Sequence, residues 1–462
     1  MKPKYFLALG LLVLGLGSCG ESFFEQYPSN NITEGNFYKT DDDFNQGVVA
    51  CYAKLKTQMS FHLTEIGYRG DENVLESMAV STQNRYDIDH FAETANNGIL
   101  NDIWNAWYNG IYRCNDVLDH MTGAKIANYD KYRGECLFLR SWWYFNLYRV
   151  FGVVPITRTV VTPAAAKLIP RCTEEEMYTL LTEDLAEAAR LLPPTPGPEK
   201  ARVANIAAYT LLAKVYLTFG KPAEAKTALE EAMKNTSYGL ESTTKKVFDV
   251  GNKMNREIIF ALYYNKTNDN GHGYWYSANT DVLADINNPT PTFKAIYDSE
   301  KDNRLPLISS YTKIKDNLFA MTKWYDTYDA TYTTQVGNDF PHLRYADVVL
   351  MYAEALAESG GSLGDALEWL NKTRTRAGLD ELTTDEVKSL AEFRRELAAE
   401  RGREFALEGH RWFDLVRLGL AVEYFRGLGY SLDAHNLIFP IPQSQIEIVN
   451  NPSILWQNPG FN

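Results

Sequence analysis

The sequence lacks the excess of positive charge that nucleic-acid binding requires. It has 46 Lys and Arg against 59 Asp and Glu, which gives a net charge of −13 at neutral pH over 462 residues. Proteins that bind nucleic acid present clustered basic side chains to the phosphates, and docking on an anionic bilayer by charge needs similar clusters. The composition therefore predicts no nucleic-acid partner.

The short motifs of common metal and catalytic sites are also scarce. No HExxH or P-loop motif occurs. The five cysteines have no CxxC or zinc-finger spacing, which argues against a metal cluster. Cys51, Cys114, Cys136 and Cys172 could pair as disulfides in an exported protein, but buried free thiols are the favoured prediction.

Long hydrophobic runs are missing as well, with one short exception at the N-terminus. Lys2 and Lys4 precede the apolar run YFLALGLLVLGLG at 5–17. These 13 residues rise only about 20 Å as a helix, whereas a hydrocarbon core is about 30 Å thick. A basic start with a short apolar core indicates a signal peptide over 1–18.

The residues at the predicted cut, Leu16-Gly17-Ser18-Cys19, resemble a bacterial lipobox. In such a sequence the cysteine is lipidated and becomes the first residue of the mature chain, and more than one acyl chain gives stable anchoring. Cys19 is therefore the predicted lipid attachment, followed by a tether over 19–39. The alternative is an ordinary signal peptide with a chance cysteine.

Helical periodicity is abundant in the remainder, which is predicted to be a single domain over 40–462. The sequence TDDDF at 40–44 predicts a helix start, with Thr40 and Asp43 as a capping box. A calcium loop is the alternative there, although the spacing matches no EF-hand. Apolar residues recur at three- and four-residue spacing over 99–121, 130–151, 173–192, 203–219, 222–234, 342–358, 363–377 and 386–418.

Two stretches, 201–233 and 350–374, have the pattern of tetratricopeptide-like helix pairs. The similar sequences LYRVFG and VYLTFG begin at 147 and 215, twice the roughly 34-residue period of that repeat. Such repeats must stack to bury their faces. The predicted fold is mainly α, a tetratricopeptide-like scaffold with little β and with long irregular insertions at about 66–98 and 236–341. REIIFALYY at 256–264 is the strand-like exception.

Several motifs, in order along nearly the whole chain, resemble the SusD/RagB lipoproteins of Bacteroidetes. They are the lipobox followed by FFEQYP, LRYADVVLMYAEALAESG at 343–360 with LNKTRTRAGL at 370–379, ERGREFALEGHRWFDLVRLG at 400–419, and FPIPQSQI at 439–446 with the final QNPGFN. The resemblance implies a helical scaffold with long loops and an outer-membrane lipoprotein facing the exterior. It also implies a lid on a TonB-dependent, SusC-like transporter, to which the protein delivers glycans; some relatives bind peptides instead.

Two irregular stretches have the residues that a sugar site needs, and they correspond broadly to the family's ligand region. A sugar presents an apolar C–H face and a rim of hydroxyls, so flat aromatic rings and planar polar groups would bind it. Each aromatic has the alternative role of fastening a long loop to the scaffold. The predicted aromatic platforms are Tyr274, Trp275, Tyr276, Trp324, Tyr325 and Tyr328, and the predicted polar rim is Asp71, Asn84, Arg85 and Tyr86.

The charged segment at 394–415 is the competing candidate for an active site. Helical spacing aligns Glu400, Glu404 and Glu408, with Arg401 and Arg411 expected among their partners. Ion pairing and helix packing are the favoured interpretation, and the nearby His410 and Asp414 need no catalytic role.

The sequence does not place the two carboxylates that a glycoside hydrolase needs across a cleft. The prediction is therefore a non-catalytic, glycan-binding lipoprotein without a cofactor, a structural Ca²⁺ being the alternative. Peptide cargo, a hydrolase and a pure protein-interaction scaffold are the alternative functions.

Overall fold

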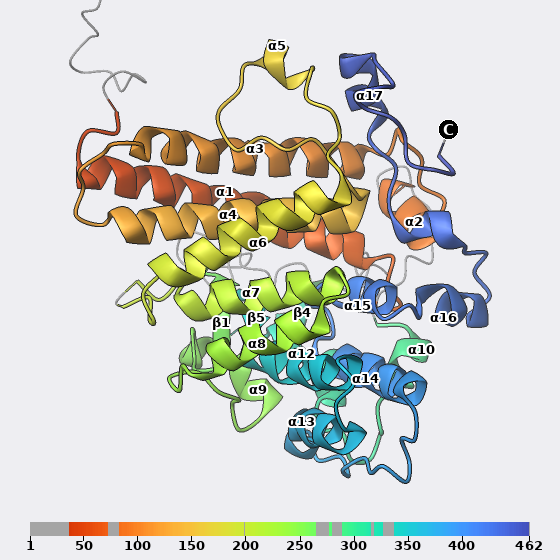
Figure 1. Ribbon diagram of the computed structural model, residues 1–462. Coiled ribbons are helices and arrows are strands. Elements are labelled where there is room, and N and C mark those ends of the chain that lie inside the picture. The colour runs from red at the N-terminus through yellow and green to blue at the C-terminus, as the bar shows by residue number, and fades with distance from the viewer. Residues whose placement is uncertain are drawn as a thin grey trace, which may run out of the picture.

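A computed structural model describes residues 37–72, 83–197, 199–264, 277–279, 289–315, 318–326 and 337–461. Most of these residues are helical, which confirms the predicted fold class (Figure 1). The longer helices are α1 (Asp41–Gly67), α3 (Gly98–Met121), α4 (Tyr129–Phe151), α6 (Glu174–Leu191), α7 (Asn205–Thr218), α8 (Pro222–Met233), α12 (Tyr345–Glu358), α13 (Leu363–Arg376) and α14 (Leu390–Glu404).

Short elements connect and decorate these helices. The short α-helices are α2 (Gln83–Asp89), α5 (Pro163–Ala166), α9 (Thr244–Val247), α10 (Pro291–Lys294), α11 (Leu305–Ser309), α15 (Arg411–Arg417), α16 (Ala421–Gly427) and α17 (Gln443–Val449). The 3₁₀ turns include η2 (Val250–Asn252), η4 (Thr322–Trp324) and η5 (Ala434–Leu437), and the strands are β1 (Ile258–Leu262), β2 (Ser277–Asn279), β3 (Tyr311–Lys315), β4 (Leu318–Met321) and β5 (Phe340–Arg344).

The predicted capping box at the start of α1 is confirmed. The Thr40 hydroxyl accepts a hydrogen bond from the Asp43 backbone N–H at 3.3 Å, and the Asp43 carboxylate accepts one from the Thr40 N–H at 2.7 Å. Two N–H groups that the first helical turn would leave unsatisfied are thus paired. The neighbouring Asp41 carboxylate accepts hydrogen bonds from Asn128, at the start of α4.

The long helices pack in chain order, and the predicted repeat pairs correspond to α7 with α8 and α12 with α13. Helix α4 packs between α3 and α6, and α7 packs between α6 and α8. Helix α8 also packs on α12, although residues 234–344 separate them in the sequence. The two repeat pairs therefore form one stack, with the large insertion leaving and re-entering it (Figure 1).

The ends of this insertion are joined by strands. β1 pairs antiparallel with β5, with Ile258 opposite Arg344 and Leu262 opposite Phe340, and a second sheet has the order β2-β4-β3. The strand predicted at 256–264 is confirmed as β1. The helix predicted from 342 begins only at Tyr345, because residues 340–344 pair with β1 as β5.

Two further expectations about local structure are wrong. The single helix predicted over 386–418 is divided into α14 and α15 by a turn in which Leu407 and Gly409 have φ values of 62° and 76°. Left-handed φ values interrupt a right-handed helix. The stretch expected to be irregular from 66 to 98 contains α2.

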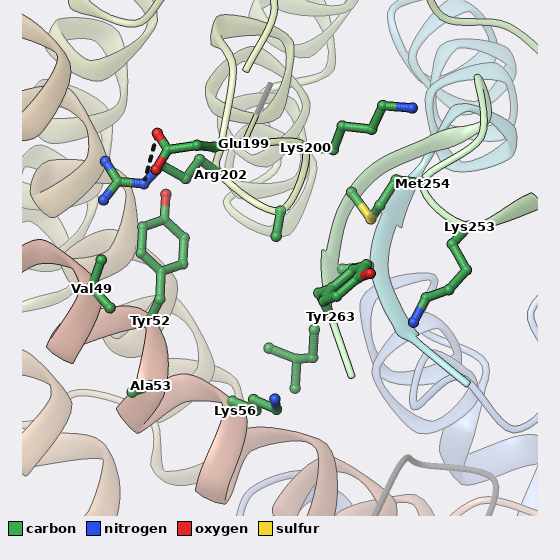
Figure 2. Close-up of a pocket in the computed structure, with 13 residues that line it drawn as sticks. Val49, Tyr52, Ala53, Lys56, Glu199, Lys200, Arg202, Lys253, Met254 and Tyr263 are labelled. Atoms are coloured by element: carbon green, nitrogen blue, oxygen red, sulfur yellow. Dashed lines mark ion pairs between the residues drawn. The ribbon is translucent and has the colours of Figure 1, made fainter. Parts of the chain in front are cut away.

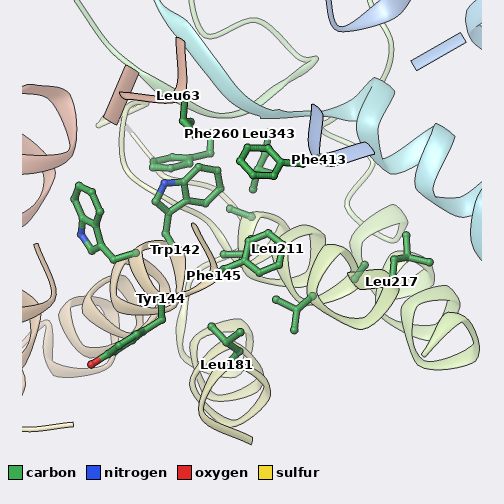
Figure 3. Close-up of a cluster of buried hydrophobic side chains, with 14 of the residues drawn as sticks. Leu63, Trp142, Tyr144, Phe145, Leu181, Leu211, Leu217, Phe260, Leu343 and Phe413 are labelled. Carbon is green, nitrogen blue, oxygen red and sulfur yellow. The ribbon is translucent and has the colours of Figure 1, made fainter. Parts of the chain in front are cut away.

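The apolar core runs between the helical layers and the β1–β5 pair (Figure 3). The Trp142 ring of α4 lies 5.6 Å from Phe260 of β1, centre to centre. Helices α3 and α4 approach closely at Gly110, where an added Cβ would come within 2.2 Å of the Trp143 ring. Tight interdigitation of this kind makes the core sensitive to single added or removed carbon atoms.

The cysteines of the described ranges belong to this apolar interior. The structure has Cys51, Cys114, Cys136 and Cys172 as free, buried thiols, which confirms the prediction favoured over disulfides. In the part of the chain that the structure describes, no helix combines the length and the hydropathy needed to cross a membrane.

Candidate functional site

Several of the predicted site residues belong to segments that the structure leaves undescribed. The predicted platforms Tyr274, Trp275, Tyr276 and Tyr328 and the predicted lipid attachment Cys19 lie outside the described residues. Their roles stay predictions. The remaining candidates can be placed individually.

Asp71 lies just beyond α1 and is buried in an ion pair. Its carboxylate accepts a hydrogen bond from Arg411 of α15 at 2.9 Å and another from the Tyr424 hydroxyl of α16. The Thr290 hydroxyl donates to the Asp71 backbone carbonyl at 2.8 Å. Asp71 thus connects α1 to α15, α16 and the end of the large insertion, so its carboxylate is already engaged by the fold.

The candidates Asn84, Arg85 and Tyr86 lie together on α2. Arg85 pairs with the buried Glu65 of α1 at 3.2 Å, and Tyr86 stacks on His90 with 3.8 Å between ring centres. Burial raises the pKa of Glu65 to about 7, although Arg85 acts in the opposite direction. The exposed Asn84 side-chain oxygen accepts a hydrogen bond from the Gly98 N–H at 3.3 Å.

Trp324 is a core residue rather than an open platform. Only 1% of it is exposed, and its ring packs against Phe248 at 5.1 Å and Phe340 at 6.1 Å. The neighbouring Tyr325 is half-buried. In this structure Trp324 presents no face to a ligand, because it fills the space between the η2 region and β5; a platform role for it is not supported.

The Asp71 and Trp324 regions nevertheless meet at one turn, residues 405–408. The Glu72 carboxylate accepts a hydrogen bond from the Leu407 N–H at 3.1 Å. From the other side, the Lys323 ammonium pairs with Glu408 at 2.7 Å. The structure therefore brings the bases of the two predicted loop regions to the same place on the scaffold.

The charged segment around this turn forms a buried ion network. Glu400 accepts hydrogen bonds from Arg304 at 2.7 Å and Arg403 at 3.0 Å. Glu404 accepts them from Arg344 at 2.6 Å, from Arg304 and from Arg376. Glu408 accepts one from Arg344 at 2.8 Å. These carboxylates are buried and paired, so the structural interpretation of the segment is confirmed.

The prediction that Arg401 and Arg411 pair with these three glutamates is wrong. Arg401 pairs with Asp347 at 2.9 Å and Asp414 at 2.7 Å, whereas Arg411 pairs with Asp71. Adjacent helical positions differ by about 100° around the axis, which turns Arg401 toward α12. Helix α14 ends at Glu404, so helical spacing from the glutamates does not predict the position of Arg411.

His410 has no exposed imidazole that could act as a base. It is buried, and its ring stacks on Phe405 at 4.6 Å. Burial, reinforced by neighbouring cations, lowers its pKa well below the ordinary value of 6.5. The histidine is therefore neutral and serves the packing of the turn.

A cleft of about 650 Å³ opens between α1 and the base of the large insertion (Figure 2). This volume is typical of a small-ligand site. In the described part of the chain, the cleft is lined by Val49, Tyr52, Ala53 and Lys56 of α1, by residues 199–202, by Lys253 and Met254, and by residues 261–263.

Two tyrosines give this cleft aromatic surfaces. Tyr263, at the end of β1, is 43% exposed, and the Lys253 ammonium lies 4.0 Å from its ring centre. Tyr52 is half-buried, and its hydroxyl accepts a hydrogen bond from the Val203 N–H at 3.1 Å. Burial raises the pKa of Tyr52 well above 10, so its hydroxyl stays protonated and able to donate.

The charged groups of the cleft are suited to binding rather than to acid–base catalysis. Glu199 is the one carboxylate among the described lining residues, and it pairs with Lys131 at 2.8 Å. That hydrogen bond lowers its pKa. Arg202 is committed to the buried Glu135 at 3.1 Å, and Lys253 to Asp339 at 2.8 Å. Within the described lining no second carboxylate faces Glu199 across the cleft, as hydrolysis of a glycoside would need.

Comparisons with known proteins agree with this arrangement of scaffold and loops. Residues 294–461 match the SusD family model, and residues 27–217 match a family described as starch-binding and associating with the outer membrane. The chain belongs to the SusD/RagB family. This confirms the resemblance inferred from the motifs. Residues 218–293, which lie between the two matches, include the first part of the large insertion.

Relatives of this SusD/RagB protein match it over different lengths. SusD-like protein P2 of Formosa agariphila is 26% identical over 99% of this chain and 100% of the relative. The starch-binding protein SusD of Bacteroides thetaiotaomicron is 33% identical over 154 residues, which are 31% of this chain and 26% of that protein. The structure of surface glycan-binding protein A from Bacteroides fluxus has the same fold, with a TM-score of 0.76, 21% identity and coverage of 91% and 99% of the two chains.

The cleft of this SusD/RagB protein escaped prediction from the sequence. Tyr52 belongs to a helix without a distinctive motif, and Tyr263 follows a strand whose pairing partner lies about 80 residues away. The one available signal was the polar end of REIIFALYY, where two tyrosines succeed an apolar run. In the described ranges no group of three or more His, Cys, Asp or Glu is arranged to hold a metal.

Proposed function

We propose that this protein is an outer-membrane lipoprotein that binds an oligo- or polysaccharide and delivers it to a SusC-like, TonB-dependent transporter. It is anchored through Cys19, faces the exterior and performs no covalent chemistry. The observation that carries the proposal is the cleft at the base of the insertion, with its exposed tyrosine and hydrogen-bonding rim, in a chain of the SusD/RagB family.

The chemistry of the cleft supports a sugar as its ligand. The Tyr263 ring offers a flat apolar face for the C–H side of a pyranose, and the ammonium of Lys253 lies against the same ring. Tyr52, Lys56 and Lys200 supply hydroxyl and ammonium donors for sugar hydroxyls around the cleft (Figure 2). Support also comes from the similar proteins, one of which is named a starch-binding protein and another a surface glycan-binding protein.

The loop residues predicted from the sequence remain part of this proposal. Tyr274, Trp275, Tyr276, Tyr325 and Tyr328 belong to the insertion whose first part, around β1, lines the cleft. They would extend the binding surface beyond Tyr263. A long glycan needs several such contacts, because each contributes only modest affinity.

Native gels containing single polysaccharides test the proposal directly. The chain without residues 1–18 should be retarded by at least one glycan, starch being the first to try. Tyr263→Ala should weaken that binding by about tenfold, which corresponds to about 1.4 kcal/mol. Tyr112→Ala is the matched control, because Tyr112 is exposed to the same extent but lies on α3, outside the described lining of the cleft.

The same samples distinguish the other functions. Binding of peptides with no retardation by any glycan would replace the sugar by a peptide cargo. Release of reducing sugar by the pure protein would contradict the absence of catalysis. Equal retardation of the parent chain and Tyr263→Ala would show that the cleft is not part of the binding site.

A further inference from the structure

Exposed apolar side chains are concentrated in one part of the surface. Eight large apolar side chains are exposed among the described residues, and five of them surround the connection between α4 and α6. Leu168 is 72% exposed and Ile448 is 51% exposed. Concentrations of this kind mark interaction sites, since soluble surfaces rarely gather large apolar groups. We call this region the α5 surface; its exposed members are Tyr112, Val160, Leu168, Ile448 and Trp456.

The α5 surface is a firmly held projection rather than a loose loop. At its base Pro155 and Arg171 form an antiparallel bridge, and the Tyr108 hydroxyl donates to the Pro155 carbonyl at 2.7 Å. Arg171 also donates to the carbonyls of Val153 at 2.7 Å and Trp456 at 2.8 Å. The tip of the projection, α5, stands away from the helical layers (Figure 1). The apolar side chains are therefore presented on a fixed support.

Grooves lie on both sides of this projection. One, of about 380 Å³, lies toward α3 and α17 and includes Trp104, Tyr112 and Ile448 in its lining. The other, of about 520 Å³, lies toward α6 and includes Ile156 and Thr179. A ridge between two grooves can interlock with extended segments of a partner, burying far more area than a flat face.

The charge of the projection differs from that of the whole chain. Residues 152–172 contain Arg158, Lys167 and Arg171 and no Asp or Glu, whereas the chain has a net charge of −13. The Arg171 guanidinium is engaged in hydrogen bonds at the base of the projection. Arg158 pairs with Glu183 at 2.8 Å, and both side chains are exposed. Lys167 lies beside Leu168 at the tip and is exposed. The groove toward α6 has Glu175 and Glu176 in its lining, so it is the tip around Lys167 that suits acidic neighbours on an apolar partner.

The N-terminal tether arrives next to the α5 surface. The Tyr38 hydroxyl donates to Asp116 of α3 at 2.8 Å, and the Tyr38 ring stacks on His120 of the same helix. Tyr112 of the α5 surface lies on α3 one turn before Asp116. Between the predicted anchor at Cys19 and Phe37 lie residues that can span at most about 60 Å. The tether therefore keeps this side of the body close to whatever occupies the membrane.

We infer that the α5 surface is where this protein docks on the extracellular loops of its transporter. The inference rests on the proposed function and adds the surface and the chemistry of its partner. Loop segments with apolar side chains fill the two grooves, and acidic groups on those loops face Lys167. The glycan cleft lies elsewhere, between α1 and the insertion, so capture and docking use different residues.

Site-specific photocrosslinking in intact cells tests the inference with the lipidated chain. p-Benzoylphenylalanine is placed at position 168, at position 448 and, as a matched control, at position 428. The parent Leu428 is also exposed, but it is not among the described residues that line either groove. Adducts are identified by mass spectrometry. A TonB-dependent transporter captured from 168 and 448 and not from 428 is the expected result.

Substitutions provide the second measurement. Leu168→Asp and Ile448→Asp should each reduce the transporter recovered with the tagged protein by about tenfold, as loss of a central apolar contact does. Leu428→Asp should leave recovery unchanged, and glycan retardation of all three variants should equal that of the parent, which shows that they are folded.

The possible failures are separable. A transporter captured only from 428 would overturn the docking surface while leaving the transporter as partner. Lipid or a second copy of the chain captured from 168 would also overturn it. No transporter from any position would contradict the delivery role itself, whereas glycan binding would still be decided by the gels.

Discussion

Trp142 in α4 and Glu404 in α14 are both buried, but they are held by opposite kinds of interaction. Trp142 packs against Phe138 and Phe260 within the apolar layers. Glu404 lies among the guanidinium groups of Arg304, Arg344 and Arg376. The layers from α1 to α8 are held mainly by non-directional apolar contacts, with buried pairs such as that of Arg140 in α4 with Asp184 in α6 at 2.7 Å. In the region around α14, directional ion pairs form a connected network.

The difference follows from what each region has to hold. The α1–α8 layers consist of successive helices that associate mainly by burying complementary apolar faces. The α14 region must fasten the large insertion to the scaffold, through Arg304 within the insertion and Arg344 just after it. Buried ion pairs contribute little net stability compared with apolar packing, but breaking one leaves an uncompensated charge. The network thus fixes the position of the insertion that frames the cleft.

Among the proposed changes, Arg344→Met should have the largest effect, because it disrupts the buried ion network around α14. It removes a guanidinium group that contacts Glu257, Glu404 and Glu408. Arg304, Arg376 and Lys323 still contact these carboxylates, but part of the buried negative charge is left uncompensated. We therefore expect a loss of about 3–5 kcal/mol in the free energy of unfolding, measured by urea denaturation.

The control for Arg344→Met is Arg394→Met on the same helix as Glu404. Arg394 pairs with Glu358 at 2.6 Å, but its side chain is more than one-third exposed. Exposed pairs contribute about 0–1 kcal/mol. Equal losses in the two variants would contradict the special role assigned to the buried network.

Acid should weaken the same network by a smaller amount, because protonated carboxyls still accept hydrogen bonds. Burial alone would raise the pKa of Glu404, but the surrounding guanidinium groups outweigh it and hold the pKa below the ordinary value of 4.5; the same holds for Glu400. A carboxyl of this kind contributes stability that is present above its unfolded pKa and is lost as the pH falls through its folded pKa. Glu257 acts in the opposite sense, since burial raises its pKa.

Hydrogen exchange can locate this acid effect. Protection should hold from pH 7 down to about 4.5, the ordinary pKa of a glutamate. Below that pH we expect amides in α11, β5 and α14 to lose protection before those in α3 and α4. Simultaneous loss in both regions, after correction for the intrinsic exchange rate, would show that the ion network does not fasten the insertion separately.

Gly110→Ala tests the apolar side of the comparison. The added Cβ would lie 2.2 Å from the Trp143 ring unless α3 and α4 separate. Overpacking of this kind costs about 1–3 kcal/mol, measured as a lower thermal midpoint. Gly67→Ala is the control, because nothing lies within 4 Å of its added Cβ; an equal loss there would argue against the steric cause.

The smallest expected effect is that of Thr40→Ala. This change removes the hydroxyl that caps the Asp43 N–H at the start of α1. Helix caps contribute about 1 kcal/mol, and the site touches neither the network nor the core. Urea denaturation should therefore show a small loss with an unchanged slope, and a loss comparable to that of Arg344→Met would indicate a larger role for the tether junction.

Much of the scaffold follows from local sequence. Thr40 and Asp43 predict the start of α1, and the pattern at 201–233 predicts the α7–α8 pair, because caps and apolar spacing act over a few residues. The stacking of α8 on α12 was also expected from the repeat pattern. The break after Glu404 was missed, since nothing in the local periodicity shows that residues 405–408 must turn to meet Glu72 and Lys323.

The candidate site was less predictable for the same reason. Trp324 and Asp71 are residue types expected in a sugar site, but contacts with Phe248 and Arg411, which are distant in sequence, bury them. Tyr52 and Tyr263 are brought to one cleft from different ends of the scaffold. No single segment contains the information that these two residues face the same space.

The sequence by itself determined the helical class, the helix starts, the repeat pairs and the family, because short-range periodicity and ordered motifs encode them. Only the tertiary structure decided which charges pair, which aromatic rings are buried and which remain open to a ligand or a partner. Arg304, Arg344 and Arg376 reach Glu404 from three separate segments. Side-chain burial and pairing depend on such long-range contacts, and these exist only once the insertion has folded back onto the helical stack.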